Sequence, residues 1–296
     1  MKTLMVGGTG LTGTHASLYL REQGHDVTIV SRSRVDNPLL QDFGHLAGSY
    51  TSDDLSVAQL EGFDNLVFAA GADIRQLPPD VDEADFFQEV NARAIPRFFE
   101  MARQAGISRA VYIGTYYPMV VPEKIDTSPY VRSRYLADEG VRALNSSSFN
   151  VCSLNPPFII GYLPGVHLPH LKVLVDFAAG RLEGMPLVAP AGGVNHIASQ
   201  SMSEAIHGAL ERGEGGKGYL VGDENLSWKA YLEMFFQSAG NPVDLPVSED
   251  EHPLFPDMIL YAGRNALIEY EPDNTELRYS RSNVRAAVDQ LVEAYL

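Results

Sequence analysis

A glycine-rich turn near the start of the sequence constrains the fold more than any other feature. The turn, Gly7–Gly13, follows a short apolar segment, Leu4–Val6, and opens a stretch with helical periodicity, Gly13–Gln23. Its glycine spacing allows a tight turn, a close backbone approach to a pyrophosphate, and close packing of helix on strand. A helix N-terminus also offers free N–H groups to phosphates. The alternative is an ordinary strand-to-helix turn. We expect a dinucleotide to bind at Gly7, Thr9, Gly10, Leu11 and Gly13.

Short apolar segments alternate with longer helical ones through the first half of the chain. We expect strands at Asp26–Val30, Asn65–Ala69, Ala110–Ile113 and Asn150–Leu154, and helices at about Asp85–Ala105 and Tyr130–Leu144. Such alternation is typical of a parallel sheet covered on both faces. The predicted fold class is therefore α/β, a Rossmann doubly wound parallel sheet with helices on both faces.

The composition of the sequence changes after Asn155, where prolines and glycines become frequent. Such stretches form loops around short elements. We expect residues 1–155 to form the dinucleotide-binding Rossmann domain, joined by a returning segment at about 194–224. Residues 156–193 and 225–296 would then form a smaller C-terminal substrate-binding cap.

The end of the second predicted strand bears on the choice of dinucleotide. An Asp or Glu at this place would bond the adenosine ribose and indicate NAD. This chain has Ser31 and Arg32 instead, with Arg34 close by. A guanidinium can bind a phosphate through two parallel hydrogen bonds. NADP is therefore the predicted cofactor, with NAD as the less favoured alternative; the other interpretation of these residues is a solvated loop.

Charge and cysteine content exclude several classes of function. The chain has 22 Lys and Arg against 38 Asp and Glu, a formal charge of −16. Such a surface repels nucleic acid and anionic lipid, so we expect neither as a partner. The single cysteine excludes an intramolecular disulfide, and the histidines and acids form no convincing metal set. No apolar run reaches the about 20 residues that span a bilayer. We expect a cytoplasmic protein.

A tyrosine and an arginine four residues apart share one face of a predicted helix. They are Tyr130 and Arg134, and Thr115 follows the predicted strand before them. The chain here resembles the extended short-chain dehydrogenase/reductases of the NAD-dependent epimerase/dehydratase superfamily, whose signature is Tyr-x-x-x-Lys with a Ser or Thr nearby. Asn155–Gly161 looks most like the dihydroflavonol reductase and cinnamoyl-CoA reductase branch. The resemblance departs at the lysine, which is Arg134 here.

The resemblance implies catalytic and cofactor-binding roles. Tyr130 would donate a proton to a substrate carbonyl oxygen, and Thr115 would hydrogen-bond the same oxygen. Arginine keeps the charge of the lysine and could bond the nicotinamide ribose, but it effectively never deprotonates. Besides the turn and the end of the second strand, the implied cofactor-binding residues are Ala69, Ala70, Asn91, Arg134 and Pro157.

Three functions follow from these features. The first is an NADP-dependent oxidoreductase that reduces a small carbonyl compound by hydride transfer. The second is a nucleotide-sugar epimerase or dehydratase that keeps its cofactor tightly bound. The third is a non-enzymatic NADP-sensing protein on the same fold, which the loss of the lysine keeps open. The resemblance also suggests a homodimer.

Overall fold

A seven-stranded sheet forms one end of the molecule in the computed structural model, which describes residues 1–34 and 36–296. Its order is β10-β6-β5-β4-β1-β2-β3, and each neighbouring pair is parallel. The switch in strand order lies between β1 and β4, which is where open α/β sheets bind ligands. The strands are β1 (Lys2–Val6), β2 (Asp26–Ser31), β3 (Gly44–Ala47), β4 (Asn65–Phe68), β5 (Arg109–Ile113), β6 (Asn150–Asn155) and β10 (Gly218–Leu220).

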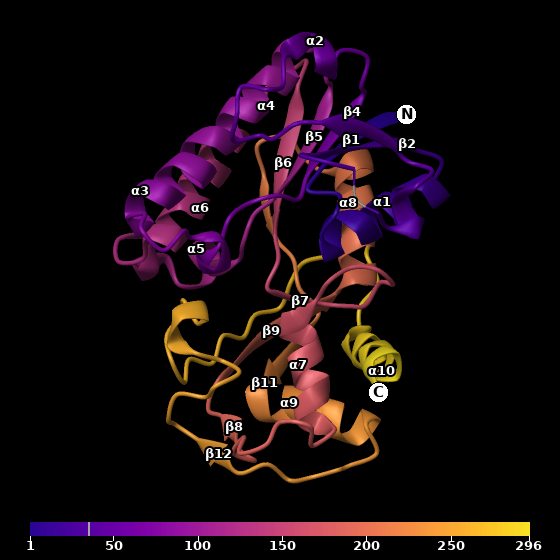
Figure 1. The fold of residues 1–296 in the computed structure, drawn as a ribbon. Helices are drawn as coiled ribbons and strands as arrows, with labels where there is room; N and C mark the ends of the chain where they lie inside the picture. Colours follow the sequence, from indigo (N-terminus) through magenta and orange to yellow (C-terminus); the bar gives the residue numbers. More distant parts are fainter. Residues whose placement is uncertain (35) are drawn as a thin grey trace.

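Helices cover both faces of this sheet, which confirms the predicted fold class (Figure 1). Side chains of β1 alternate between the faces: Met5 packs in the core beneath α1 and α8, whereas Leu4 and Val6 pack beneath α4 and α6. One face carries α1 (Leu11–Glu22) and α8 (Ser199–Arg212); the other carries α2 (Val57–Leu60), α3 (Glu83–Phe87), a π-helical stretch (Gln88–Arg93), α4 (Ala94–Gln104) and α6 (Pro129–Arg142), with α5 (Tyr117–Val120) at its lower end.

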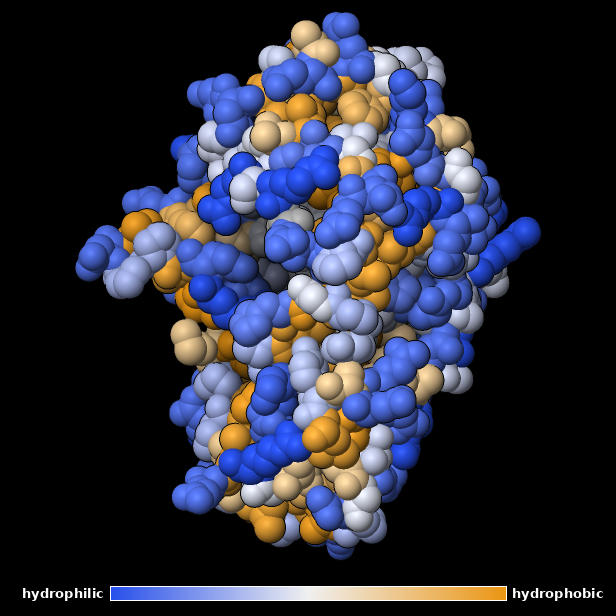
Figure 2. Space-filling view, turned by 45° about the vertical axis from the view of Figure 1, so that its right-hand side comes forward, coloured by the Kyte–Doolittle hydropathy of each residue, from blue (hydrophilic) through white to orange (hydrophobic). Residues whose placement is uncertain are grey.

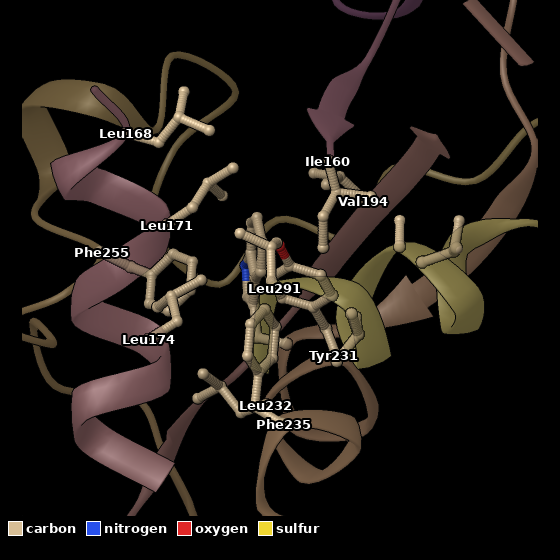
Figure 3. Packing of buried hydrophobic residues seen from close by; sticks show 14 of the residues in the cluster. Ile160, Leu168, Leu171, Leu174, Val194, Tyr231, Leu232, Phe235, Phe255 and Leu291 are labelled. Atoms are coloured by element: carbon tan, nitrogen blue, oxygen red, sulfur yellow. The ribbon is translucent and has the colours of Figure 1, made fainter. Parts of the chain in front are cut away.

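The remaining elements form a smaller unit below the sheet (Figure 1). Its apolar core is filled from α7, α9, α10 and the loop that carries Phe255 (Figure 3). This unit holds β7 (Phe158–Ile160), β8 (Ala189–Pro190), β9 (Gly193–Ala198), β11 (Glu224–Ser227) and β12 (Val247–Ser248), with helices α7 (Pro169–Ala178), α9 (Trp228–Ser238) and α10 (Val284–Tyr295). We refer to it as the cap. Single turns of 3-10 helix lie at Pro38–Leu40, Ile74–Gln76, Pro122–Ile125 and Asp257–Ile259.

The segment expected to return to the large sheet divides between the two units. Helix α8 packs on α1, and β10 pairs with β6 at the edge of the large sheet. In contrast, β9 lies between β7 and β11 in a second sheet of order β11-β9-β7. Both edges of β9 are thereby paired, so this strand belongs with the cap elements.

The two units share one hydrophobic core. Tyr116, Tyr117 and Tyr130 of the sheet unit belong to the same buried cluster as α7, α9 and α10 of the cap. Figure 2 shows hydrophilic residues spread over one face of the molecule, which is hollowed between its upper and lower halves. Within residues 1–34 and 36–296, no helix has the length and apolarity to cross a membrane.

Candidate functional site

The glycines of the turn between β1 and α1 differ in how much space surrounds them. Gly7 has φ +83°, and a Cβ there would lie 2.7 Å from the carbonyl carbon of Ala69. A Cβ on Gly13 would lie 2.2 Å from the carbonyl oxygen of Gly7. At Gly10 the nearest atom to such a Cβ is 3.9 Å away. Packing therefore requires Gly7 and Gly13, and also Gly8, where a Cβ would lie 2.8 Å from a side-chain carbon of Ile29, whereas the face of Gly10 is open.

The N-terminus of α1 opens onto this turn. Gly10 is its N-cap and supplies no side-chain acceptor for the first N–H groups of the helix. The hydroxyl of Thr14 is already bonded to the carbonyl of Gly8, 2.9 Å away, and so fixes the turn. Leu11, the first helical residue, packs on the edge of the cap core. Free N–H groups, the helix dipole and the open Gly10 face fit a pyrophosphate.

The end of β2 places its polar residues in different positions. Ser31 ends the strand, and its hydroxyl donates to the carbonyl of Ser33 at 2.8 Å. Arg32 is exposed and forms no ion pair with the residues that the structure describes. Arg34, rather than Arg32, lines a small hollow of about 10 Å³ together with Thr9 and Ser31. Sequence spacing did not separate the two arginines, because a loop has no fixed side-chain alternation.

Asn91 holds the loop that follows β4. Its side-chain oxygen accepts from the N–H of Ala72 and its amide nitrogen donates to the carbonyl of Ala72, both at 3.0 Å. The same nitrogen donates to the hydroxyl of Ser133 on α6 at 3.2 Å. This clamp sets the loop containing Ala69 and Ala70, which lie directly over Gly7. Asn91 thus acts on the expected cofactor cleft through the backbone of this loop.

Tyr130 and Thr115 lie near the end of β5, at the boundary between the sheet unit and the cap. Tyr130 lies in the first turn of α6 and is 7% exposed, while Thr115 follows β5 and is 8% exposed. Burial raises the pKa of Tyr130 above its ordinary value, and the charge of Arg134 and a hydrogen bond with Thr115 partly offset this rise. The N–H of Tyr116 donates to the carbonyl of Pro156 at 3.1 Å, which ties Thr115 to the buried Pro157 turn after β6.

Arg134 lies one helical turn after Tyr130 and points toward the sheet. Its Nη2 donates to the carbonyl of Ile113, 2.8 Å away, at the end of β5. Its guanidinium lies 5.6 Å from the ring centre of Tyr112. Its Nε is buried and has no hydrogen-bond partner among the described residues. A buried donor without a partner leaves a place for an acceptor from a bound group.

A charged pair borders the same site on the loop after β4. The Nε of Arg75 donates to both carboxylate oxygens of Asp73 at 3.0 Å. Burial raises the pKa of Asp73, but bonds and charge from Arg75 outweigh it and lower the pKa overall. His170, near the start of α7, lies close enough for both charges to act on its imidazole. The pair thus lies between the sheet unit and the cap.

Three further side chains at this site were missed by the sequence analysis. Tyr261, from the segment before α10, stacks on the ring of Tyr130, and Phe87 and Tyr117 contact the same ring edge-on. No local pattern marks Tyr261, because its contact joins parts of the chain that are far apart in sequence. Phe87 has helical spacing to Asn91 and could have been placed beside the site on that ground.

The parallel sheet, the glycine turn and the buried Tyr130–Thr115–Arg134 group define a dinucleotide-binding protein of the Rossmann class. The model of the "NAD dependent epimerase/dehydratase family" matches residues 3–222. The chain belongs to this family, as the sequence resemblance predicted; its position in a particular branch stays a prediction.

Known proteins resemble this chain along nearly its whole length. It is 24% identical over 310 residues to a UDP-glucose 4-epimerase from Corynebacterium glutamicum, covering 94% of this chain and 93% of that one. The crystal structure of gox2253 superposes with a TM-score of 0.78 at 22% identity, covering 99% and 97% of the two chains. A UDP-N-acetylglucosamine 4-epimerase from Bacillus cereus gives a TM-score of 0.75 at 15% identity, covering 99% and 96%. At these identities the solved structures show a shared fold.

Proposed function

We propose that this protein transfers a hydride equivalent between a nicotinamide dinucleotide and a hydroxyl-bearing carbon of its substrate, with Tyr130 as the acid–base group. The observation that carries the proposal is the gathering of Tyr130, Thr115 and Arg134 next to the loop at residues 69–71: Gly71 of this loop lies against Arg134, and Ala69 and Ala70 lie against Gly7 of the glycine turn. When bound, the nicotinamide ring would accept the hydride equivalent from that carbon or return it. The N–H groups of α1 and the open face of Gly10 would hold the pyrophosphate.

The side chains of the protein would donate the proton to the substrate oxygen and accept it from that oxygen. Tyr130 donates it when a carbonyl is reduced and accepts it when a hydroxyl is oxidised. Thr115 hydrogen-bonds the same oxygen and holds it near the phenol. The fixed charge of Arg134 favours the phenolate over the phenol, against the effect of burial. Arg134 does not pass the proton onward, because a guanidinium does not lose its own.

A nucleotide sugar is the leading substrate class. The family match and the similarity to a UDP-glucose 4-epimerase along both chains support it. In such an enzyme the substrate is oxidised and reduced again at one carbon, so the dinucleotide is recycled on the protein. The expected product is an epimer, formed without net consumption of cofactor.

A second candidate is an NADP-dependent reductase of a small carbonyl compound. The aromatic rings around Tyr130 support it, since Phe87, Tyr117 and Tyr261 offer an apolar surface to a substrate. A preference for NADP is likewise a proposal. It rests on Arg32 and Arg34 after β2, where an NAD-binding chain commonly has an acid.

One set of measurements separates these candidates. One sample of the purified protein is denatured, and the supernatant is tested for released dinucleotide. A second, native sample is assayed with UDP-glucose, and with aldehydes and ketones plus NADPH. Epimer formation with retained cofactor supports the first candidate, and stoichiometric NADPH oxidation supports the second. Tyr130→Phe should lower either activity by about 100-fold or more, in line with the loss of a general acid–base group. Dinucleotide binding without any turnover, or full activity in Tyr130→Phe, would overturn the proposal.

A further inference from the structure

Three aromatic rings enclose the ring of Tyr130, and one of them comes from the cap. Phe87 and Tyr117, from helices of the sheet unit, lie edge-on with ring centres 5.4 and 6.5 Å away. Tyr261 lies nearly parallel, at 4.2 Å and 18°. It also contacts Tyr117 edge-on at 5.4 Å. Two rings stacked at this distance leave no room for a substrate atom between them.

The turn that carries Tyr261 is fastened to the cap. Leu260 is 7% exposed in the cap core, and the N–H of Gly263 donates to its carbonyl at 2.8 Å. Gly263 has φ +105°, a conformation that favours glycine. Across the turn, Arg264 binds Asp257 at 2.6 Å through half-exposed side chains. Such exposed pairs add little stability, because solvent screens the two charges. Tyr261 is therefore joined to the cap core through Leu260, and on the outer side of its turn an exposed ion pair is the contact that crosses it.

This cover restricts how a substrate reaches Tyr130. One face of the Tyr130 ring is closed by the stacked ring of Tyr261, whereas Phe87 and Tyr117 meet the ring only edge-on. A reacting oxygen therefore approaches along the edge of the stacked rings. A bulky group on the cap side of the reacting carbon would collide with the ring of Tyr261.

We propose that Tyr261 is a specificity-determining residue, which excludes substrates with bulky groups on the cap side of the reacting carbon. This inference rests on the proposed function, because it takes Tyr130 as the group that meets the substrate oxygen. Removing the ring should widen the range of accepted substrates. Removing only its hydroxyl should not, since the stacked ring forms the barrier.

Two readouts test this role with three variants. Tyr261→Ala removes the ring, Tyr261→Phe keeps it, and Met258→Ala changes an exposed side chain of the same segment as a matched control. Nitration of Tyr130 by tetranitromethane, mapped by mass spectrometry, needs no turnover. It should rise about tenfold in Tyr261→Ala, where reaction no longer waits for local opening. It should stay near the wild-type rate in the other two variants.

The second readout is the ratio of kcat/KM for UDP-N-acetylglucosamine to that for UDP-glucose, or for a bulky and a small ketone if the protein is a reductase. Tyr261→Ala should raise this ratio by about tenfold, the scale of discrimination by a pocket wall. An active wild type with an unchanged ratio or unchanged nitration in Tyr261→Ala overturns the role of Tyr261 alone. A wild type that turns over neither pair overturns the proposed function, and nitration still reports whether Tyr261 covers Tyr130.

Discussion

The guanidinium of Arg134 fills the space that a side chain at position 71 would need. A Cβ on Gly71 would lie 2.5 Å from Nη1 of Arg134, and the glycine has φ +156°. The arginine that replaces the expected lysine is thus matched by a residue without a side chain on the loop after β4. The shape of this loop and the charge beside Tyr130 depend on each other.

Gly71→Ala should therefore weaken both the fold and the site. We expect a loss of about 1–3 kcal/mol in the free energy of unfolding, as for overpacked sites. Denaturant unfolding would measure it. In the double variant Gly71→Ala/Arg134→Lys, the flexible lysine should relieve part of the collision and recover about 1 kcal/mol as a coupling energy. Strictly additive losses in the two single variants would show that the two side chains do not compete for space.

The glycine turn offers a pair of substitutions with opposite expected effects. Gly13→Ala places a Cβ against the backbone carbonyl of Gly7 and should destabilise the protein by about 2–4 kcal/mol. Gly10→Ala meets open space at φ −87°, so the melting temperature should hardly change. Its methyl group should nevertheless obstruct the pyrophosphate and weaken dinucleotide binding by about tenfold or more. Thermal melts and dinucleotide titrations would measure both effects, and unchanged affinity in Gly10→Ala would exclude this turn as the phosphate site.

The dinucleotide preference can be tested at the end of β2. If NADP is the cofactor, Arg32→Ala should weaken NADPH binding by about tenfold, the loss of one charge-assisted contact, and leave NADH binding unchanged. Arg34→Ala tests the second arginine in the same titration. Arg285→Ala, at an exposed site on α10, controls for the change in overall charge. Tighter binding of NADH than of NADPH by the wild-type protein would contradict the NADP assignment.

The stability of the protein should fall in mild acid because of a histidine in the cap. His196 is fully buried against Tyr231, and burial lowers its pKa to about 3 from an ordinary 6.5. Below pH 6.5 the imidazole of His196 binds a proton in the unfolded chain, whereas in the folded protein it does so only near pH 3. Stability is therefore complete above pH 6.5 and falls below it, at up to about 1.4 kcal/mol per pH unit.

His196→Phe keeps the ring contact with Tyr231 and removes the titration. Denaturant unfolding between pH 7 and 4 should show a shallower slope for the variant, and the difference between the two proteins removes contributions shared by other groups. Parallel pH dependences would show that His196 is protonated in the folded protein as readily as in the unfolded chain.

Local sequence patterns predicted the sheet unit well because its constraints are local. Glycine spacing predicted the turn at Gly7–Gly13, and a short apolar strand buried on both faces, such as β1, is readable from its own residues. The helix that carries Tyr130 was predicted for the same reason. The position of β9 was not predicted. A strand needs the same apolar residues whether it pairs with β7 in the cap or with β6 in the large sheet, so its own sequence does not distinguish the two.

The residues of the candidate site were named from the sequence and their roles stay predictions, whereas their arrangement could not be predicted. Tyr130, Thr115 and Arg134 are brought together as the resemblance implied. The bond from Arg134 to the Ile113 carbonyl, however, depends on the height at which α6 crosses the end of β5. Asn91 does not reach the expected cleft directly, because its side-chain amide is hydrogen-bonded to the backbone of Ala72. Such distances are set by the packing of elements rather than by residue type.

The core shared by the sheet unit and the cap limits how these units can be exchanged between relatives. Because Tyr261 of the cap and Tyr117 of the sheet unit contact each other as well as Tyr130, a chimera with a foreign cap would alter the surroundings of Tyr130 even with the sheet unit intact. Swapping the cap to change the substrate would therefore also change the acid–base chemistry proposed for Tyr130, unless positions 117 and 261 are transferred as a pair.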